Sequence, residues 1–181
     1  MKLQSSVHFG KPYESYRRGK ALKKKAFVFP GQGAQKPFMG KSFYETFLES
    51  KEIFQKAEDL LSMHITSKIF SSDEEALKRT DFCQVALFVT SCAMLRAIET
   101  CAKDIDLKIT AGLSLGEYSA LVAARKTTFE DLLPVVKRRG ELMHKASCVI
   151  AQGMSAVMGL DPSQIKGKYQ IANLNCPGKW S

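Results

Sequence analysis

A serine flanked by glycines is the residue whose type and spacing point most directly to covalent chemistry. The segment Gly112-Leu113-Ser114-Leu115-Gly116 matches the pattern G-x-S-x-G, which forms a sharp strand-to-helix turn that projects a nucleophilic hydroxyl. The helix after such a turn presents free backbone N–H groups and a positive dipole end to an oxyanion. Because five-residue patterns also arise by chance, a plain glycine-flanked turn with a capping serine explains these residues equally well.

Two further kinds of side chain could serve such a serine. A serine nucleophile needs a base, and the sequence has three histidines, His8, His64 and His144, each of which fits a structural or surface role better. The arginines of 138–140 could hold a carboxylate through two parallel hydrogen bonds, which a lysine cannot do. On spacing alone, a solvated helix face beside Lys137 is the simpler interpretation of this pair.

Apolar runs and helical spacing predict the elements that must position these side chains. Short apolar runs bounded by breakers indicate strands, and apolar residues three or four apart indicate helices. Pro134 is compatible with a helix only in its first turn. The predicted elements are strands at 26–29, 109–112, 154–160 and 171–174, and helices within 42–61, from 74, and at 84–101, 115–124 and 130–146. This order predicts an α/β fold whose character changes near Gly153.

Composition excludes several classes of protein. The 181 residues are 45% hydrophobic and 25% charged, which is typical of a soluble globular chain. The longest unbroken apolar runs, 85–89 and 120–124, have five residues each, and they predict no membrane-spanning helix. None of the five cysteines lies in a C-x-x-C pair, so we expect no structural zinc or other metal and no disulfide framework.

The positive charge is concentrated in one segment. The net charge is +9, but residues 1–25 hold eight Lys and Arg residues and one acid, leaving 19 bases and 17 acids in the rest. The body is nearly neutral, so the basic balance does not indicate nucleic-acid binding by the fold. Three interpretations of 1–25 stay open: a solvated disordered arm, an organelle transit peptide, or translation from a start codon set too early.

Motifs spread along the body together resemble one enzyme family. They occur in family order at 27–35 (FVFPGQGAQ), 39–40, 112–122 (GLSLGEYSALV), 139–143 (RGELM), 153–154 and 173–178 (NLNCPG). The sequence thus resembles the malonyl-CoA:acyl carrier protein transacylases of type II fatty-acid synthesis and the acyltransferase domains of polyketide and animal fatty-acid synthases. The likeness covers about residues 26 to 178, and joint occurrence of these motifs is highly specific.

The resemblance implies an α/β-hydrolase-like large subdomain with an inserted ferredoxin-like small subdomain. The expected organisation is a basic tail at 1–25, an incomplete acyltransferase subdomain at 26–152 and the start of the ferredoxin-like subdomain at 153–181. The implied activity is that of an [acyl-carrier-protein] S-malonyltransferase without a cofactor, whose substrate is malonyl-CoA and whose protein partner is acyl carrier protein. We expect no membrane or nucleic-acid partner, a monomer if complete, and a cytoplasmic location, or a plastid or mitochondrion if 1–25 is a transit peptide.

The resemblance also assigns roles to particular residues. Ser114 would attack the thioester and carry the malonyl group, and the backbone N–H groups of Gln32 and Leu115 would form the oxyanion hole. Arg139 would bind the free malonyl carboxylate, and an arginine left without its carboxylate is poorly compensated, which supports selection of a dicarboxylic acyl group. Asn175 is a weaker substrate-binding candidate.

Three departures from the family pattern stand out. Leu113 replaces a common histidine that is not the base, and Arg125 stands where a small residue, often glycine, is usual. The family's catalytic histidine lies in a downstream segment, and no residue of this chain matches it, so we expect a carboxy-terminally truncated chain. A frameshift near residue 179 would explain the ending, since one extra base after the Gly178 codon converts Lys-Trp-Ser to Gln-Met-Val. A real splice or split-gene product would also explain it.

Three functions therefore remain open on the sequence. The leading one is malonyl transfer, and a truncated, impaired remnant of that enzyme, poorly folded and nearly inactive alone, is an alternative. A serine esterase of the α/β-hydrolase type is the other, but it needs an acid and a histidine after the serine and does not explain the motifs at 27–35 and 139–143.

Overall fold

The computed structural model of this protein contains a pair of parallel strands, and Ser114 follows the second of them. Strand β1 (Lys25–Phe29) pairs with β2 (Leu107–Gly112), with Phe27 opposite Thr110 and Phe29 opposite Gly112. Five helices lie between the strands in sequence, as parallel pairing requires a long crossover connection. Both strands and the α/β class were predicted from the sequence and are confirmed.

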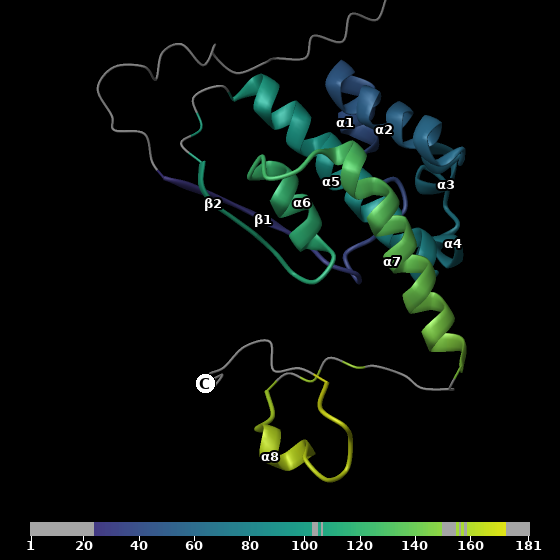
Figure 1. Cartoon of the computed structure of the whole chain (residues 1–181), viewed down its shortest axis with the longest axis vertical. Coiled ribbons are helices and arrows are strands. Elements are labelled where there is room, and N and C mark those ends of the chain that lie inside the picture. The colour runs from purple at the N-terminus through teal and green to yellow at the C-terminus, as the bar shows by residue number, and fades with distance from the viewer. Residues whose placement is uncertain are drawn as a thin grey trace, which may run out of the picture. The chain divides into compact units, whose positions relative to one another are not determined.

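The structure describes residues 24–102, 105, 107–149, 155, 157 and 159–172. The chain divides into two units, Met1–Ala146 and Ser147–Ser181, and Figure 1 shows the elements of each. The boundary expected at residue 153 and the ferredoxin-like character of the second part stay predictions.

The helices between the strands begin close to the predicted positions. They are α1 (Lys41–Thr46), α2 (Leu48–Leu61), α3 (Ile65–Ile69), α4 (Glu74–Lys78) and α5 (Thr80–Cys101). The Asp73 carboxylate accepts a hydrogen bond of 3.1 Å from the backbone N–H of Ala76 and so caps α4. The prediction of one or two helices at 42–61 and of a helix start at 74 is confirmed, whereas α5 begins four residues before the expected position 84.

Helix α5 forms the centre of the hydrophobic core. Phe88 and Val89 are fully buried, and the core side chains of α2, α3 and α4 pack around this helix. Length and composition alone would let α5 cross a membrane, but 72% of its apolar window is buried inside the fold. The helix was predicted at 84–101, but the count of unbroken apolar runs did not indicate a membrane-length apolar window because scattered polar residues interrupt it. The burial of α5 explains its apolar character.

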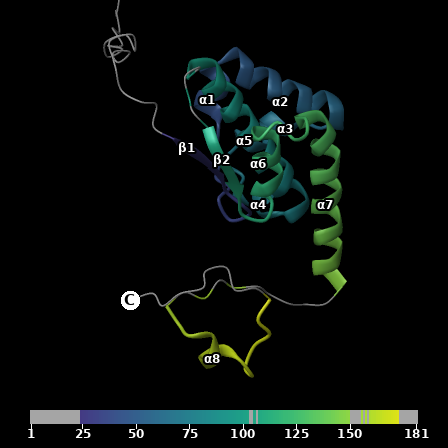
Figure 2. The same ribbon diagram turned by 60° about the vertical axis from the view of Figure 1, so that its left-hand side comes forward.

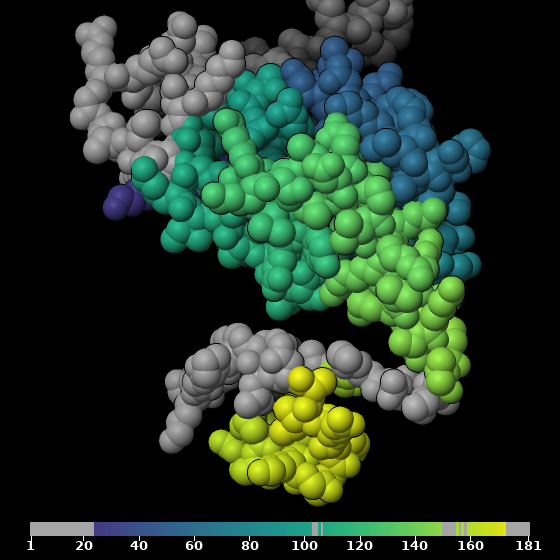
Figure 3. Space-filling view, viewed as in Figure 1, coloured from purple at the N-terminus to yellow at the C-terminus, as the bar shows by residue number. Residues whose placement is uncertain are grey.

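Two helices follow β2, and the first of them packs on the sheet. Helix α6 (Gly116–Ala123) lies between the sheet and α7 (Phe129–Val149) in both ribbon views (Figures 1 and 2). Figure 3 shows the green surface of α7 on the face turned to the viewer, with the blue segments α1–α4 along one side. Both helices were predicted, and α7 extends three residues further than expected.

The expectation that Pro134 must lie in a first turn is wrong. Pro134 lies inside α7, five residues after its start, where it removes one backbone hydrogen bond. Its side of the helix is exposed, so the carbonyl of Glu130 can be hydrated instead. The neighbouring Leu133 and Val136 are fully buried, and their packing holds the helix together across the proline.

The described residues after α7 form one helix, and none of them lies in a strand. Helix α8 (Pro162–Ile165) has a capping box in which Asp161 accepts from Ser163 and Gln164 accepts from the N–H of Asp161. The described residues of 154–160 and the described residues 171 and 172 are not in strands. The described positions of 154–160 therefore do not form the continuous strand predicted there, and residues 173 and 174 of the strand predicted at 171–174 lie outside the described residues.

The two faces of the sheet differ in environment. Phe29 packs with Leu95 of α5 and with Ala120 and Ala123 of α6. On the opposite face Val28 is 76% exposed and Ile109 is 62% exposed. Parallel strands are normally covered on both faces. These two strands have apolar side chains on both faces, as buried strands do, but one face is exposed.

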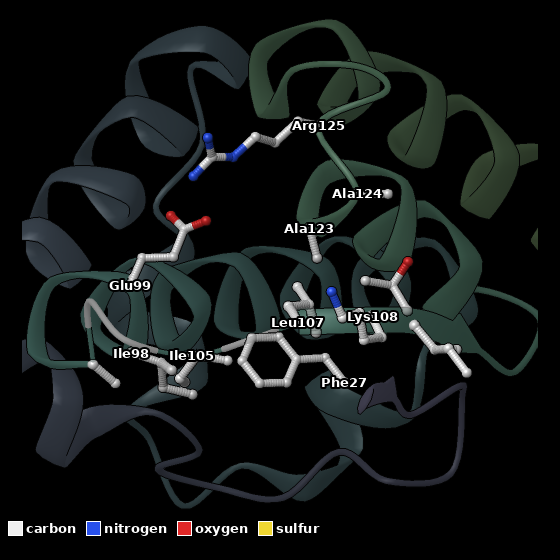
Figure 4. Close-up of a pocket in the computed structure, with 12 residues that line it drawn as sticks. Phe27, Ile98, Glu99, Ile105, Leu107, Lys108, Ala123, Ala124 and Arg125 are labelled. Carbon is white, nitrogen blue, oxygen red and sulfur yellow. The ribbon is translucent and has the colours of Figure 1, made fainter. Parts of the chain in front are cut away.

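A hollow of about 520 Å³ lies along the first residues of β2, away from Ser114. Figure 4 shows its apolar floor, which includes Phe27, and the side chains of Glu99 and Arg125 extending toward each other across its rim. Ser114 follows the other end of β2, so this hollow and the candidate site are separate.

Arg125 adopts a left-handed backbone conformation at the end of α6, with φ of 55°. The resemblance already marked this position as one where glycine is usual, and a β-carbon at positive φ costs about 1 kcal/mol.

We therefore expect Arg125→Gly to raise the free energy of unfolding by about 1 kcal/mol, measured by urea denaturation. Arg125→Ala is the control, since it removes the same charged side chain but keeps the β-carbon. Equal stability of the glycine and alanine variants would contradict the explanation.

Candidate active site

Ser114 occupies a strained turn between β2 and α6. Its φ is 52°, a left-handed value that costs a residue other than glycine roughly 1–3 kcal/mol when the surroundings enforce it. The turn is closed by a hydrogen bond of 2.9 Å from the N–H of Gly116 to the carbonyl of Leu113. Its side chain is exposed, as the G-x-S-x-G pattern predicts for a nucleophile.

A close backbone approach holds this turn against the end of β1. A β-carbon at Gly116 would lie 2.3 Å from the carbonyl oxygen of Phe29, so no larger residue fits. That same carbonyl accepts a hydrogen bond of 3.2 Å from the N–H of Leu113. The loop after β1, which contains Gln32, is thereby placed beside the serine turn.

The two proposed oxyanion donors follow from this packing. Leu115 is buried at the start of α6, and Gln32 is exposed on the neighbouring loop. Within the described part of the chain, neither backbone N–H donates a hydrogen bond, so both donors are free for an oxyanion. The Gln32 side chain donates to the hydroxyl of Thr80 at 3.2 Å, which ties the loop to the start of α5.

Arg139 reaches the serine from α7. Its Nη2 donates a hydrogen bond of 2.9 Å to Ser114 Oγ, and its guanidinium carbon lies 5.8 Å from the ring centre of Tyr118. Arg138 points elsewhere and pairs with Glu141 at 3.3 Å. The solvated-face interpretation therefore describes Arg138, whereas Arg139 belongs to the site.

Sequence reasoning missed Gln84, which is fully buried in α5. Its Oε1 accepts a hydrogen bond of 2.5 Å from Nη1 of Arg139. The available signal was a strongly polar side chain at the start of an otherwise apolar stretch, because buried polar groups are normally hydrogen-bonded. In the helix predicted at 84–101, Gln84 was only the first position.

A close crossing of α7 over the first turn of α5 brings these residues together. A β-carbon at Gly140 would lie 2.9 Å from the carbonyl oxygen of Asp81. The absence of a side chain at 140 lets the two helices approach, and the adjacent Arg139 then reaches Gln84 and Ser114.

The remaining predicted residues are placed as follows. Asn175 lies outside the described residues, so its role stays a prediction. Leu113 is 59% exposed, which agrees with a leucine being tolerated before the serine. Among the described residues, no three His, Cys, Asp or Glu side chains gather as metal ligands would.

Comparison with known proteins gives the class of the chain. The family described as "Acyl transferase domain" matches residues 26–174, and the chain belongs to this family. The serine turn, the F-P-G-Q-G loop and Arg139 all lie inside the matched region.

Within that family, the chain is similar to malonyl CoA-acyl carrier protein transacylases. It is 40% identical to the enzyme of Bacillus subtilis, over 87% of this chain and 52% of that relative. It is 37% identical to an enzyme of that name from Staphylococcus aureus, over 87% of this chain and 53% of the relative. The chain thus spans about half the length of these relatives.

Solved structures agree with the sequence comparison. A malonyl CoA-acyl carrier protein transacylase from Clostridium perfringens superposes with a TM-score of 0.63 at 40% identity, over 69% of this chain and 39% of that chain. A malonyl-transacylase in complex with a type II PKS acyl-carrier protein superposes with a TM-score of 0.61 at 37% identity. The superposition covers 67% of this chain and 39% of that chain.

The close contact at Gly140 predicts that a substitution which usually stabilises a helix lowers the stability of this protein. Glycine to alanine inside a helix normally stabilises by about 1 kcal/mol, but here the new β-carbon meets backbone. We expect Gly140→Ala to lower the free energy of unfolding by about 1–3 kcal/mol, measured by chemical denaturation.

Lys145→Ala, at an exposed position of the same helix, is the control and should change stability by less than about 0.5 kcal/mol. A stabilised Gly140→Ala variant would show that the two helices do not meet at this point.

The burial of the described thiols predicts a selective chemical reaction. Cys83 and Cys92 are buried, and Cys101 and Cys148 are exposed. Burial raises the pKa of Cys83 to about 11, against a smaller opposing effect of a backbone hydrogen bond from Gly33. Since only the thiolate reacts, iodoacetamide at pH 8 should modify Cys101 and Cys148 before Cys83 and Cys92, as measured by peptide mass spectrometry.

The raised pKa of Cys83 also predicts how the stability of the fold changes with pH. The contribution of the neutral Cys83 thiol to stability is fully present below pH 9.0. It is lost as the pH rises toward about 11, because the unfolded chain loses this proton at a lower pH than the folded chain does. Alkylation of Cys83 as fast as of Cys101 at pH 8 would contradict the burial of this thiol.

Proposed function

We propose that this chain carries the nucleophile and the carboxylate-binding group of an [acyl-carrier-protein] S-malonyltransferase. The reaction is transfer of a malonyl group from malonyl-CoA to the phosphopantetheine thiol of acyl carrier protein, in fatty-acid biosynthesis. The observation that carries the proposal is the hydrogen bond of 2.9 Å between Arg139 and Ser114 Oγ. It places a permanent cation beside the hydroxyl that would carry the acyl group.

The proposed first half-reaction forms an ester. Ser114 Oγ attacks the thioester carbonyl of malonyl-CoA and gives up its proton, and the N–H groups of Gln32 and Leu115 stabilise the oxyanion. Expulsion of the coenzyme A thiol leaves malonyl-Ser114. The thiol of acyl carrier protein then attacks this ester, so the two substrates react in ping-pong order.

The proton of the serine hydroxyl needs an acceptor. Arg139 cannot accept it, because a guanidinium stays protonated in proteins. The resemblance places a histidine base downstream of residue 178, in the half of the family fold that the chain's match to its relatives does not cover. The proposal therefore assigns the base to that part of the fold.

Arg139 gives the proposed enzyme its choice of acyl group. A short malonyl chain on Ser114 ends in a carboxylate, and the guanidinium beside Oγ can meet it with two hydrogen bonds. An acetyl group would leave the cation uncompensated, which is a penalty that a polar site can exploit for selection.

Acyl carrier protein is proposed as the second substrate, and the complex formed by one structural neighbour supports it. Carrier proteins are acidic, and basic side chains around a cleft would steer them. A cytoplasmic location is proposed by analogy with the bacterial relatives.

The test is covalent loading of the chain by thioesters, followed by intact-mass spectrometry. Malonyl-CoA should acylate Ser114, acetyl-CoA much less, and Ser114→Ala should take up neither. We expect Arg139→Ala to lower malonyl loading by roughly 10²-fold and to change acetyl loading little.

Arg138→Ala is the matched control, because Arg138 is exposed and pairs with Glu141 away from the serine. It should load like the wild type. A chain that takes up simple esters but no malonyl group would support the esterase alternative, and one that takes up neither would support the impaired remnant.

A further inference from the structure

The contacts of Gln84 distinguish it from an ordinary core residue. It is fully buried, and both ends of its amide are engaged by α7. Oε1 accepts from Nη1 of Arg139 at 2.5 Å, and Nε2 donates to Sδ of Met143 at 3.2 Å. Arg139 and Met143 are one helical turn apart, so one amide is held by two neighbouring positions of a single helix face.

The orientation of this amide is chemically determined. A guanidinium has only donors, so the group facing it must be the carbonyl oxygen. The amide nitrogen then faces a thioether, which only accepts. Rotating the amide by 180° would place two donors against each other and leave the oxygen against sulfur.

The charge of Arg139 is left without a carboxylate. Within the described residues its partners are the Gln84 carbonyl, the Ser114 hydroxyl and the face of the Tyr118 ring. All three are neutral. They direct the guanidinium toward the serine without cancelling its positive charge.

We infer that Gln84 is a positioning residue that aims Arg139 at the acyl group on Ser114 and keeps its charge free for a substrate carboxylate. This inference rests on the proposed function and adds a residue that determines the acyl-group preference. The neutrality of the amide is the essential property. A carboxylate at position 84 would form a two-bonded ion pair with Arg139 and compete with the substrate for it.

Two substitutions distinguish the effect of Gln84 on the orientation of Arg139 from its effect on the charge of Arg139. Gln84→Leu removes the acceptor at similar size, so Arg139 loses its direction. Gln84→Glu keeps an acceptor in the same place but neutralises the guanidinium. The control pair is Gln55→Leu and Gln55→Glu, because Gln55 is an exposed residue of α2 whose amide donates a hydrogen bond of 3.1 Å to Asp59, one turn along the same helix.

The first measurement does not depend on catalysis. Nitrogen-15 NMR of the arginine side chains, assigned with Arg139→Lys, reports rotation about the bonds to the two Nη groups. We expect slow rotation in the wild type and in Gln84→Glu and fast rotation in Gln84→Leu. Unchanged Arg139 signals in Gln84→Leu would overturn the inference.

The second measurement is a malonate titration followed through the same Arg139 signals. We expect malonate affinity to fall about tenfold or more in both Gln84 variants and to stay within twofold in the Gln55 pair. Wild-type malonate affinity in Gln84→Glu would overturn the inference, because a residue with a purely structural role would tolerate this substitution once the fold is kept.

Thioester loading then separates this inference from the proposed function. If Arg139 responds to Gln84 and binds malonate but Ser114 accepts no malonyl group, the inference stands and the proposed transfer fails. If Ser114 is loaded selectively and the malonyl-to-acetyl ratio is the same in Gln84→Glu, the transfer stands and the inference fails.

Discussion

The approach of a guanidinium to a serine hydroxyl is the constraint on which the rest of the site depends. The two groups belong to α7 and to the turn before α6, and they meet at 2.9 Å. Holding them there requires two close backbone contacts, at Gly116 against β1 and at Gly140 against α5. A β-carbon at either position would push apart segments whose separation sets this distance, so both glycines serve the site through packing.

The charged side chains of α7 near this contact have different kinds of partner. Ion pairs on the same helix, such as Arg138 with Glu141, lie on the solvent side, where they contribute little to stability. Arg139 instead meets a hydroxyl, an amide and an aromatic ring. An arginine kept from acidic partners in a partly buried place is suited to bind an anion, and a short dicarboxylic acyl group on the serine would supply one.

The fold separates a closed helical core from an open sheet. The core around α5 buries large side chains such as Phe54 and Phe88 completely, whereas the sheet presents Val28 and Ile109 to solvent on one face. The strands place Ser114 and the Gln32 loop, and the helices place Arg139. The site therefore lies where the two parts join, which explains why its residues come from segments distant in the sequence.

Much of this arrangement was predictable from local patterns. The strands at 26–29 and 109–112, the helix start at 74 and the strand–turn–helix context of Ser114 follow from apolar spacing, glycine positions and an acidic cap, all of which act within a few residues. The family motifs added Gln32, Leu115 and Arg139 as candidates. The alternation at 154–160 is not matched by a strand at its described positions, and strand pairing depends on a partner that a local pattern does not contain.

Other features depended on tertiary packing. Spacing alone did not choose between Arg138 and Arg139, which only the family motif distinguished. Adjacent helix positions point about 100° apart, and the crossing of α7 over α5 is what directs Arg139 to the serine. Pro134 was accepted inside a helix because Leu133 and Val136 are buried beside it. The sequence by itself determined which residues could do chemistry and which segments would carry them. Only the folded chain decided that Gln84 faces Arg139, because that contact joins residues 55 positions apart and forms only where two helices cross.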